Sequence, residues 1–133
     1  MPQSPRSVAF AFIDAINAHD LDTLAGGMSD AHRFIDSLGT VVQGREQMRK
    51  GWADYFRMVP DYKVVVQETF SHGSPVVLLG LAKGTYAKQG HVSPENVRQT
   101  PAAWRAHVKD DKLTEWSVYA DNEPIRRLMA ESA

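Results

Sequence analysis

The sequence predicts an α+β domain in which three N-terminal helices lie on one face of a strongly bent antiparallel sheet that encloses a pocket. Two observations lead to this fold class. Apolar residues recur at helical spacing before Pro60, and they alternate with polar residues after it. The chain has 133 residues, of which 43% are hydrophobic, and this length suits a single domain spanning 1–133.

Start and stop signals delimit the helices. Ser4 and Pro5 are typical of a helix start, Asp20 is typical of a helix cap, and Pro60 ends the last helical segment. Between these signals, apolar residues fall on one face of each longer segment. The predicted helices span 5–18, 21–25 and 45–58.

Beyond Pro60 the period becomes that of strands, and a short hairpin precedes the third helix. The predicted strands span 33–36, 40–43, 62–70, 76–86, 99–109 and 113–120. The last four are expected to form an antiparallel meander. The polar stretch 87–100 is longer than a hairpin needs, so it is a candidate lid over the pocket. A short final helix is predicted over 123–132.

Composition excludes several classes of function. The net charge of −1 and the pI of about 6.5 provide no basic surface for nucleic acid. The absence of cysteine excludes disulfides and thiol chemistry. The N-terminal segment lacks the pattern of a signal peptide, and no apolar run is long enough for a membrane span, so we expect a cytoplasmic protein. The five histidines show no metal-binding spacing, so we expect neither a metal nor a cofactor.

Two aspartates at element ends are candidate bases. Asp36 stands first in a turn with Gly39 fourth, where its side chain either caps the backbone or faces the pocket. In the pocket, apolar neighbours would make it a stronger base. Asp121 ends the last strand, where it is either a base or the N-cap of the final helix. Tyr55 is either a wall residue or a donor to an oxyanion.

Strand alternation predicts which side chains face inward. The apolar side chains of the last two strands share one face, and their polar neighbours share the other. With residues from the helices, the expected pocket lining is Phe12, Trp52, Trp104, Trp116 and Val118.

The stretches NAHDLD, IDSLG and QGRE, together with the last strand KLTEWSVYADN, resemble the SnoaL-like branch of the nuclear-transport-factor-2-like (NTF2-like) superfamily. The resemblance covers nearly the whole chain. It implies a cystatin-like α+β cone around a pocket. The superfamily includes polyketide cyclases, ketosteroid isomerases, limonene epoxide hydrolases, scytalone dehydratases and pocketed proteins with no known reaction.

The catalytic patterns of these relatives match the chain in part. The isomerases place a base Asp at the start of the hairpin turn, which Asp36 matches. Their oxyanion donors are a Tyr on the first helix, where this chain has Phe12, and an Asp on the penultimate strand, at or beside Trp104. SnoaL-type cyclases use an Asp at the end of the last strand, which Asp121 matches. Of the Asp-Arg-Asp set of the epoxide hydrolases, Arg105 and Asp121 supply only a part.

Three hypotheses follow. The first is an isomerase, cyclase or lyase that acts without a cofactor on a small hydrophobic carbonyl compound, with Asp36 as the preferred base and Asp121 as the second choice. The second is a non-catalytic pocket for a small hydrophobic molecule. The third is a homodimer through the outer sheet face, where Arg105, His107 and Tyr119 are expected, and it is compatible with either of the others.

Overall fold

The computed structural model describes residues 3–88, 91–121, 123, 127 and 130, and for 87, 88 and 91–96 it describes the backbone. Within these residues the chain forms three helices and six strands. The elements in chain order are α1 (Pro5–Ala18), α2 (Leu21–Gly26), β1 (Met28–Ile35), β2 (Val41–Gln43), α3 (Arg45–Met58), β3 (Lys63–Ser71), β4 (Val76–Lys88), β5 (His91–Lys109) and β6 (Lys112–Ala120).

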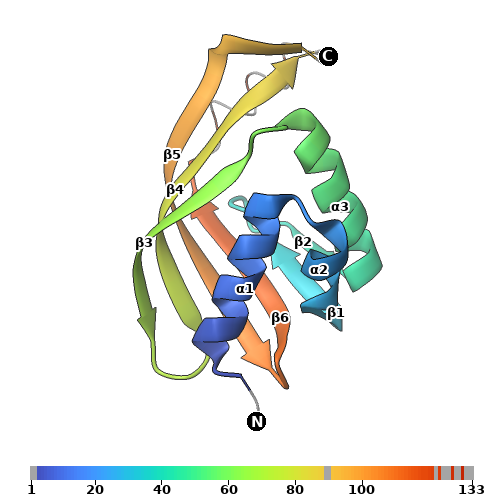
Figure 1. Ribbon diagram of the computed structural model, residues 1–133, viewed down its shortest axis with the longest axis vertical. Coiled ribbons are helices and arrows are strands. Elements are labelled where there is room, and N and C mark those ends of the chain that lie inside the picture. The colour runs from blue at the N-terminus through green and yellow to red at the C-terminus, as the bar shows by residue number, and fades with distance from the viewer. Residues whose placement is uncertain (1–2, 89–90, 122, 124–126, 128–129, 131–133) are drawn as a thin grey trace.

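One sheet contains all six strands in the order β2-β1-β6-β5-β4-β3. The last four strands pair antiparallel, as the sequence predicts. The sheet is nevertheless mixed, because β1 pairs parallel with β6. The three helices lie together on one side of the curved sheet (Figure 1). The predicted α+β class with a bent sheet over N-terminal helices is therefore confirmed.

The first helix begins and ends at the predicted residues. The Ser4 side chain accepts a hydrogen bond from the Ser7 backbone N–H at 3.1 Å, and His19 ends the helix in the left-handed conformation with φ 53°. Near its end, Asn17 forms two hydrogen bonds with the backbone of Val64: its Nδ2 donates to the carbonyl at 2.9 Å, and its Oδ1 accepts from the N–H at 2.7 Å. Asn17 thus fixes α1 to the edge strand β3.

The sheet bends where its regular register is interrupted. The register shifts between Val66 and Glu68 on β3, and between His107 and Val108 on β5; such irregularities bend strands. The backbones of β3 and β4 also approach closely at Gly80, where a Cβ would lie 1.9 Å from the Val65 carbonyl oxygen. This close approach requires glycine. The bend gives the sheet the concave face on which the helices pack.

The largest departures from the predicted bounds are in β1 and in the β4–β5 hairpin, and one prediction falls largely outside the described residues. β1 begins at Met28, five residues before the predicted start. The stretch predicted as a lid loop belongs in its described part to a long β4–β5 hairpin, in which Thr85 pairs with Val97 and Lys88 with His91. A polar composition does not end a strand whose neighbour continues the hydrogen-bond ladder. The predicted final helix at 123–132 lies mostly outside the described residues.

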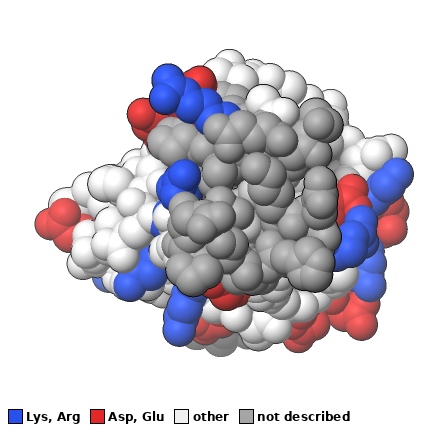
Figure 2. Space-filling view, turned by 90° about the horizontal axis from the view of Figure 1, so that it is seen from above, with Lys and Arg blue, Asp and Glu red and all other residues white. Residues whose placement is uncertain are grey.

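Charged groups of both signs are interspersed at the end of the molecule seen in Figure 2. The described residues in that view therefore form no single-sign surface. In the described part of the chain, no helix is both long enough and apolar enough to cross a membrane.

Candidate functional site

A cavity of about 330 Å³ lies between α3, the β1–β2 turn and the inner face of the sheet. Helix α3 contributes Trp52 and Tyr55 to its wall. The strands contribute Trp104, Trp116 and Val118. This volume is at the small end of the range of ligand pockets, which is about 300–1,000 Å³.

The two strand tryptophans face the cavity because strand side chains alternate between the two sheet faces. Trp104 pairs with Val118, and Ala106 pairs with Trp116, so the two indoles lie diagonally across β5 and β6. Their ring centroids are 6.5 Å apart and their planes differ by 23°. The chain contains three tryptophans. All three, Trp52, Trp104 and Trp116, line this cavity.

Rings from α3 and from Tyr62, just before β3, form another wall. Trp52 and Tyr55 meet at 90° with centroids 6.3 Å apart. Tyr55 and Tyr62 meet at 86° with centroids 4.9 Å apart. Edge-to-face contacts of this kind add to the stability of an aromatic cluster. The cluster holds rings of different orientation around one space.

Asp36 is the single charged residue among the described lining residues. Its Oδ1 accepts hydrogen bonds from the backbone N–H groups of Leu38 and Thr40, each at 2.9 Å. The Gly39 N–H donates to the Asp36 carbonyl oxygen at 2.9 Å, and Gly39 has φ 84°, which glycine adopts easily. The carboxylate is therefore held by the turn that also places it at the cavity.

The two tyrosines of the wall are poor acids. Burial raises the pKa of the Tyr55 phenol above its usual value. Burial, with a smaller contribution from Tyr55, also raises the pKa of Tyr62. Both hydroxyls therefore stay protonated near neutral pH and can donate hydrogen bonds.

Six of the eight predicted site residues line the cavity: Asp36, Trp52, Tyr55, Trp104, Trp116 and Val118. Phe12 is a correction, because it is buried in the core outside the lining. Its ring packs 5.0 Å from that of Trp116 and 6.5 Å from that of Trp52, behind both. One helical turn later, Ile16 is the residue of α1 that reaches the cavity.

Asp121 is the second predicted residue that lies outside the lining. Its side chain is exposed, and its Oδ1 accepts a hydrogen bond from the Glu123 backbone N–H at 3.1 Å. This contact is the one that an N-cap makes. Asp36 and Asp121 are therefore not brought together in the cavity wall, and the capping interpretation explains the position of Asp121.

Sequence reasoning missed two aromatic wall residues, Phe34 and Tyr62. The signal for Phe34 is its spacing, because residues two apart on a strand share a face and Phe34 precedes Asp36 by two. Tyr62 has no such signal. It enters the wall because the chain turns after α3, where the Tyr62 N–H donates to the Val59 carbonyl oxygen at 3.0 Å.

Two buried polar groups lie beside or in this wall. The His32 ring is 0% exposed, and its Nδ1 is 2.8 Å from the Leu113 carbonyl oxygen. Because a carbonyl can only accept, Nδ1 carries the proton. Neither His32 Nε2 nor Trp52 Nε1 has a hydrogen-bond partner among the described residues. Burial lowers the pKa of His32, and the Leu113 bond and Glu115 oppose this in part.

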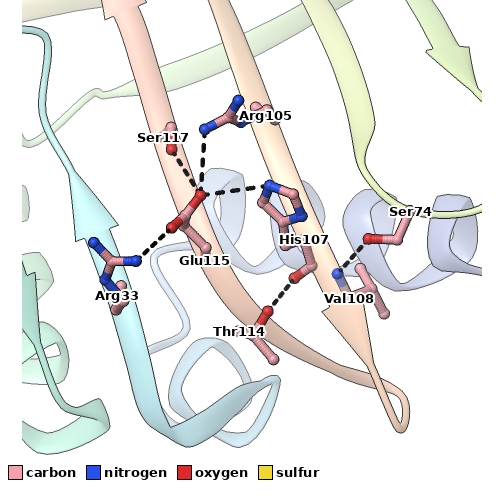
Figure 3. Close-up of polar contacts among 8 residues, drawn as sticks. All are labelled: Arg33, Ser74, Arg105, His107, Val108, Thr114, Glu115 and Ser117. Carbon is pink, nitrogen blue, oxygen red and sulfur yellow. Dashed lines mark hydrogen bonds and ion pairs between the residues drawn. The ribbon is translucent and has the colours of Figure 1, made fainter.

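A separate polar cluster lies on the outer face of the sheet (Figure 3). Glu115 contacts Arg33 at 3.2 Å, and it contacts Arg105, His107 and Ser117 at 3.5 Å each. Arg105 therefore points away from the cavity. The partial epoxide hydrolase pattern that it would form with Asp121 is wrong for this chain. In the described residues, no group of three or more histidines and acids is arranged to hold a metal ion.

Comparisons with known proteins agree with this architecture. A family model described as a SnoaL-like domain matches residues 9–116. A candidate SnoaL-like polyketide cyclase from Shewanella denitrificans superposes with a TM-score of 0.79 at 18% identity, over 96% of this chain and 97% of that one. IdmH, a candidate polyketide cyclase from Streptomyces antibioticus, gives 0.78 at 19% identity, over 96% and 99%.

A third structure is a protein with a ketosteroid isomerase-like fold from Catenulispora acidiphila, in complex with trimethylamine. It gives a TM-score of 0.74 at 18% identity, over 88% of this chain and 86% of that one. No curated protein matches the chain. At these identities the structures establish the fold. Since the family model covers most of the sequence, the chain belongs to the SnoaL-like domain family.

Proposed function

We propose that this protein binds a small, largely apolar carbonyl compound in the aromatic cavity, and that Asp36 removes a proton from the carbon beside the carbonyl. The observation that carries the proposal is a single carboxylate in an otherwise uncharged described lining. A carboxylate at the wall of an apolar cavity lies beside a bound ligand and can accept a proton from it.

The reaction uses one proton and one electron pair. An Asp36 oxygen takes the proton, the electrons of the C–H bond form a carbon–carbon double bond, and the carbonyl oxygen becomes an enolate. Return of the proton to another carbon gives an isomer. Attack of the enolate carbon on a second carbonyl of the same molecule closes a ring, and loss of a neighbouring leaving group gives an alkene. Each route returns the carboxylate to its starting state when its proton is passed on.

The turn positions the base. Both described hydrogen bonds to the carboxylate end on Oδ1, so Oδ2 is the oxygen available for the proton. Backbone N–H groups do not change rotamer, and they fix the side chain without a charged partner that would neutralise it. Asp36 is therefore held in place and remains able to act as a base.

The donor to the enolate oxygen comes from the tyrosines. Tyr55 and Tyr62 line the same cavity, and burial keeps both protonated. A preorganised O–H donor stabilises an oxyanion more than it stabilises the neutral carbonyl. These residues supply hydroxyl donors, which Phe12 and Trp104 do not carry.

Exchange in D₂O tests the proposal without the natural substrate. We expect the protein to accelerate replacement of the hydrogens beside the carbonyl of 2-tetralone, a bicyclic apolar ketone, as followed by proton NMR. Asp36→Asn keeps an oxygen acceptor for Leu38 and Thr40 but removes the base, so the acceleration should fall roughly 100-fold. Asp30→Asn removes the same charge at an exposed site and should change nothing.

Two results would contradict the proposal. Equal exchange rates for the wild-type protein and Asp36→Asn would eliminate Asp36 as the base. A loss confined to Asp121→Asn would assign the proton transfer to that residue.

A non-catalytic pocket is the second candidate function. It is supported by the buried Phe12 and Trp104, which stand where the isomerases carry a hydroxyl and a carboxyl donor. The structural neighbour that holds trimethylamine also shows a fold of this type with a small molecule bound. For such a pocket, 2-tetralone would bind, and its exchange rate would match that in buffer.

A further inference from the structure

We infer that the aromatic cavity prefers ligands that carry an apolar ammonium group, such as a tertiary or quaternary amine, over neutral or anionic molecules of the same shape. The inference rests on the proposed function for the location of the site. It does not require Asp36 to act as a base.

The charges of the lining give the sign of this preference. Asp36 is acidic, and no lysine, arginine or histidine is among the described lining residues. An anion in this cavity would lose its hydration and meet a carboxylate without a compensating cation. A cation in the same place would gain a partner of opposite charge. The described wall therefore rejects anions and attracts cations.

The aromatic walls strengthen the attraction. The face of an indole or phenol ring carries negative potential, and tryptophan attracts cations best. Trp52, Trp104 and Trp116 all line the cavity, together with Tyr55 and Tyr62. Since Trp52 and Tyr55 meet at 90°, and Tyr55 and Tyr62 at 86°, ring faces point in more than one direction. An ammonium group can thus contact more than one π surface.

The type of cation follows from the apolar remainder of the wall. A primary ammonium is strongly hydrated and needs several hydrogen-bond acceptors. Besides Asp36, the described side-chain acceptors are the oxygens of Ser37, Gln47 and the two tyrosines, and the other lining side chains carry no oxygen acceptor. A quaternary ammonium has no N–H to satisfy, and its methyl groups pack against aliphatic residues such as Ile16 and Val118. Alkylated ammonium ions therefore fit this wall better than primary amines do.

Three probes of similar shape separate charge from shape. Phenyltrimethylammonium is the cation, tert-butylbenzene its neutral isostere and benzenesulfonate the anion. Tryptophan fluorescence reports binding directly because every tryptophan lines the cavity, and calorimetry gives the affinity. We expect the cation to bind about 10-fold more tightly than the isostere, and no binding of the anion at concentrations that saturate with the cation. Binding of the isostere or the anion as tight as that of the cation, or no binding of the cation, would overturn the inference.

Matched variants test the source of the preference. Asp36→Asn should weaken the cation about 10-fold and leave the neutral isostere unchanged, whereas Asp30→Asn, at a carboxylate that is 89% exposed, should leave both unchanged. Loss of both ligands in a folded Asp36→Asn protein would overturn the charge argument. This outcome is independent of the D₂O exchange experiment. The protein can prefer the cationic probe without accelerating hydrogen exchange in 2-tetralone, and it can accelerate that exchange without preferring the cation.

Discussion

Acid destabilises the folded protein through His32, and the structure gives the sign and the limit of the effect. The folded-state pKa of His32 lies below the unfolded value of about 6.5, chiefly because burial disfavours the charged ring. The unfolded chain therefore binds more protons at acid pH. The stabilisation is fully present above pH 6.5 and is lost as the pH falls below it.

The size of the effect follows from one proton. Between the two pKa values, the free energy of unfolding should fall by about 1.4 kcal/mol per pH unit through this group. From pH 6.5 to 5.0 the loss is at most about 2 kcal/mol. Protonated Nε2 would be a charged donor without a partner in the described core, and the Leu113 hydrogen bond and the charge of Glu115 offset this cost only in part.

His32→Asn isolates this contribution. The Asn amide can donate to the Leu113 carbonyl in place of Nδ1, but it does not titrate. Urea unfolding at several values between pH 5.0 and 8.0 should show a smaller acid-dependent loss for the variant than for the wild type. The exposed residue His72 supplies the control, because His72→Asn should follow the wild-type curve. Parallel curves for the wild type and His32→Asn would refute the reasoning.

Three further predictions concern packing and association. Asn17→Ala should lower the free energy of unfolding by about 2–3 kcal/mol, since it leaves both backbone groups of Val64 without their partner. A free energy from urea unfolding that differs from the wild-type value by less than about 0.5 kcal/mol would contradict this. Gly80→Ala should lower the free energy of unfolding by more than about 3 kcal/mol, because its Cβ meets the Val65 carbonyl, and an unchanged melting temperature would be the contrary result. We also expect a homodimer through the outer sheet face, where Tyr119 is 54% exposed; light scattering should give twice 14.8 kDa, whereas 14.8 kDa at high concentration would exclude it.

The sequence predicted best where local chemistry decides the structure. Helices α1 and α3 have their predicted bounds, because cap residues at one end and a left-handed residue or proline at the other act within a few positions. The inward Trp104 and Trp116 also follow from alternation alone. These signals depend on neighbours along the chain.

Long-range pairing was not predictable in the same way. β1 has no strict alternation, since Asp30 is exposed between the buried Met28 and His32 and the pairing with β6 shifts in register between Met28 and Arg33. Phe12 was expected in the lining, yet Ile16, one turn further along the same face of α1, lines the cavity instead. The orientation of one helix depends on contacts such as that between Asn17 and β3, and no local pattern reveals them.

The claim that the aromatic cavity is the ligand site is tested most directly by NMR of the indole N–H groups in ¹⁵N-labelled protein. Addition of saturating 2-tetralone should shift the signals of Trp52, Trp104 and Trp116 together, because all three line the same 330 Å³ space. The backbone signals of Arg105 and Tyr119 on the outer sheet face should stay in place. Unmoved indole signals, or shifts confined to the outer face, would contradict the account.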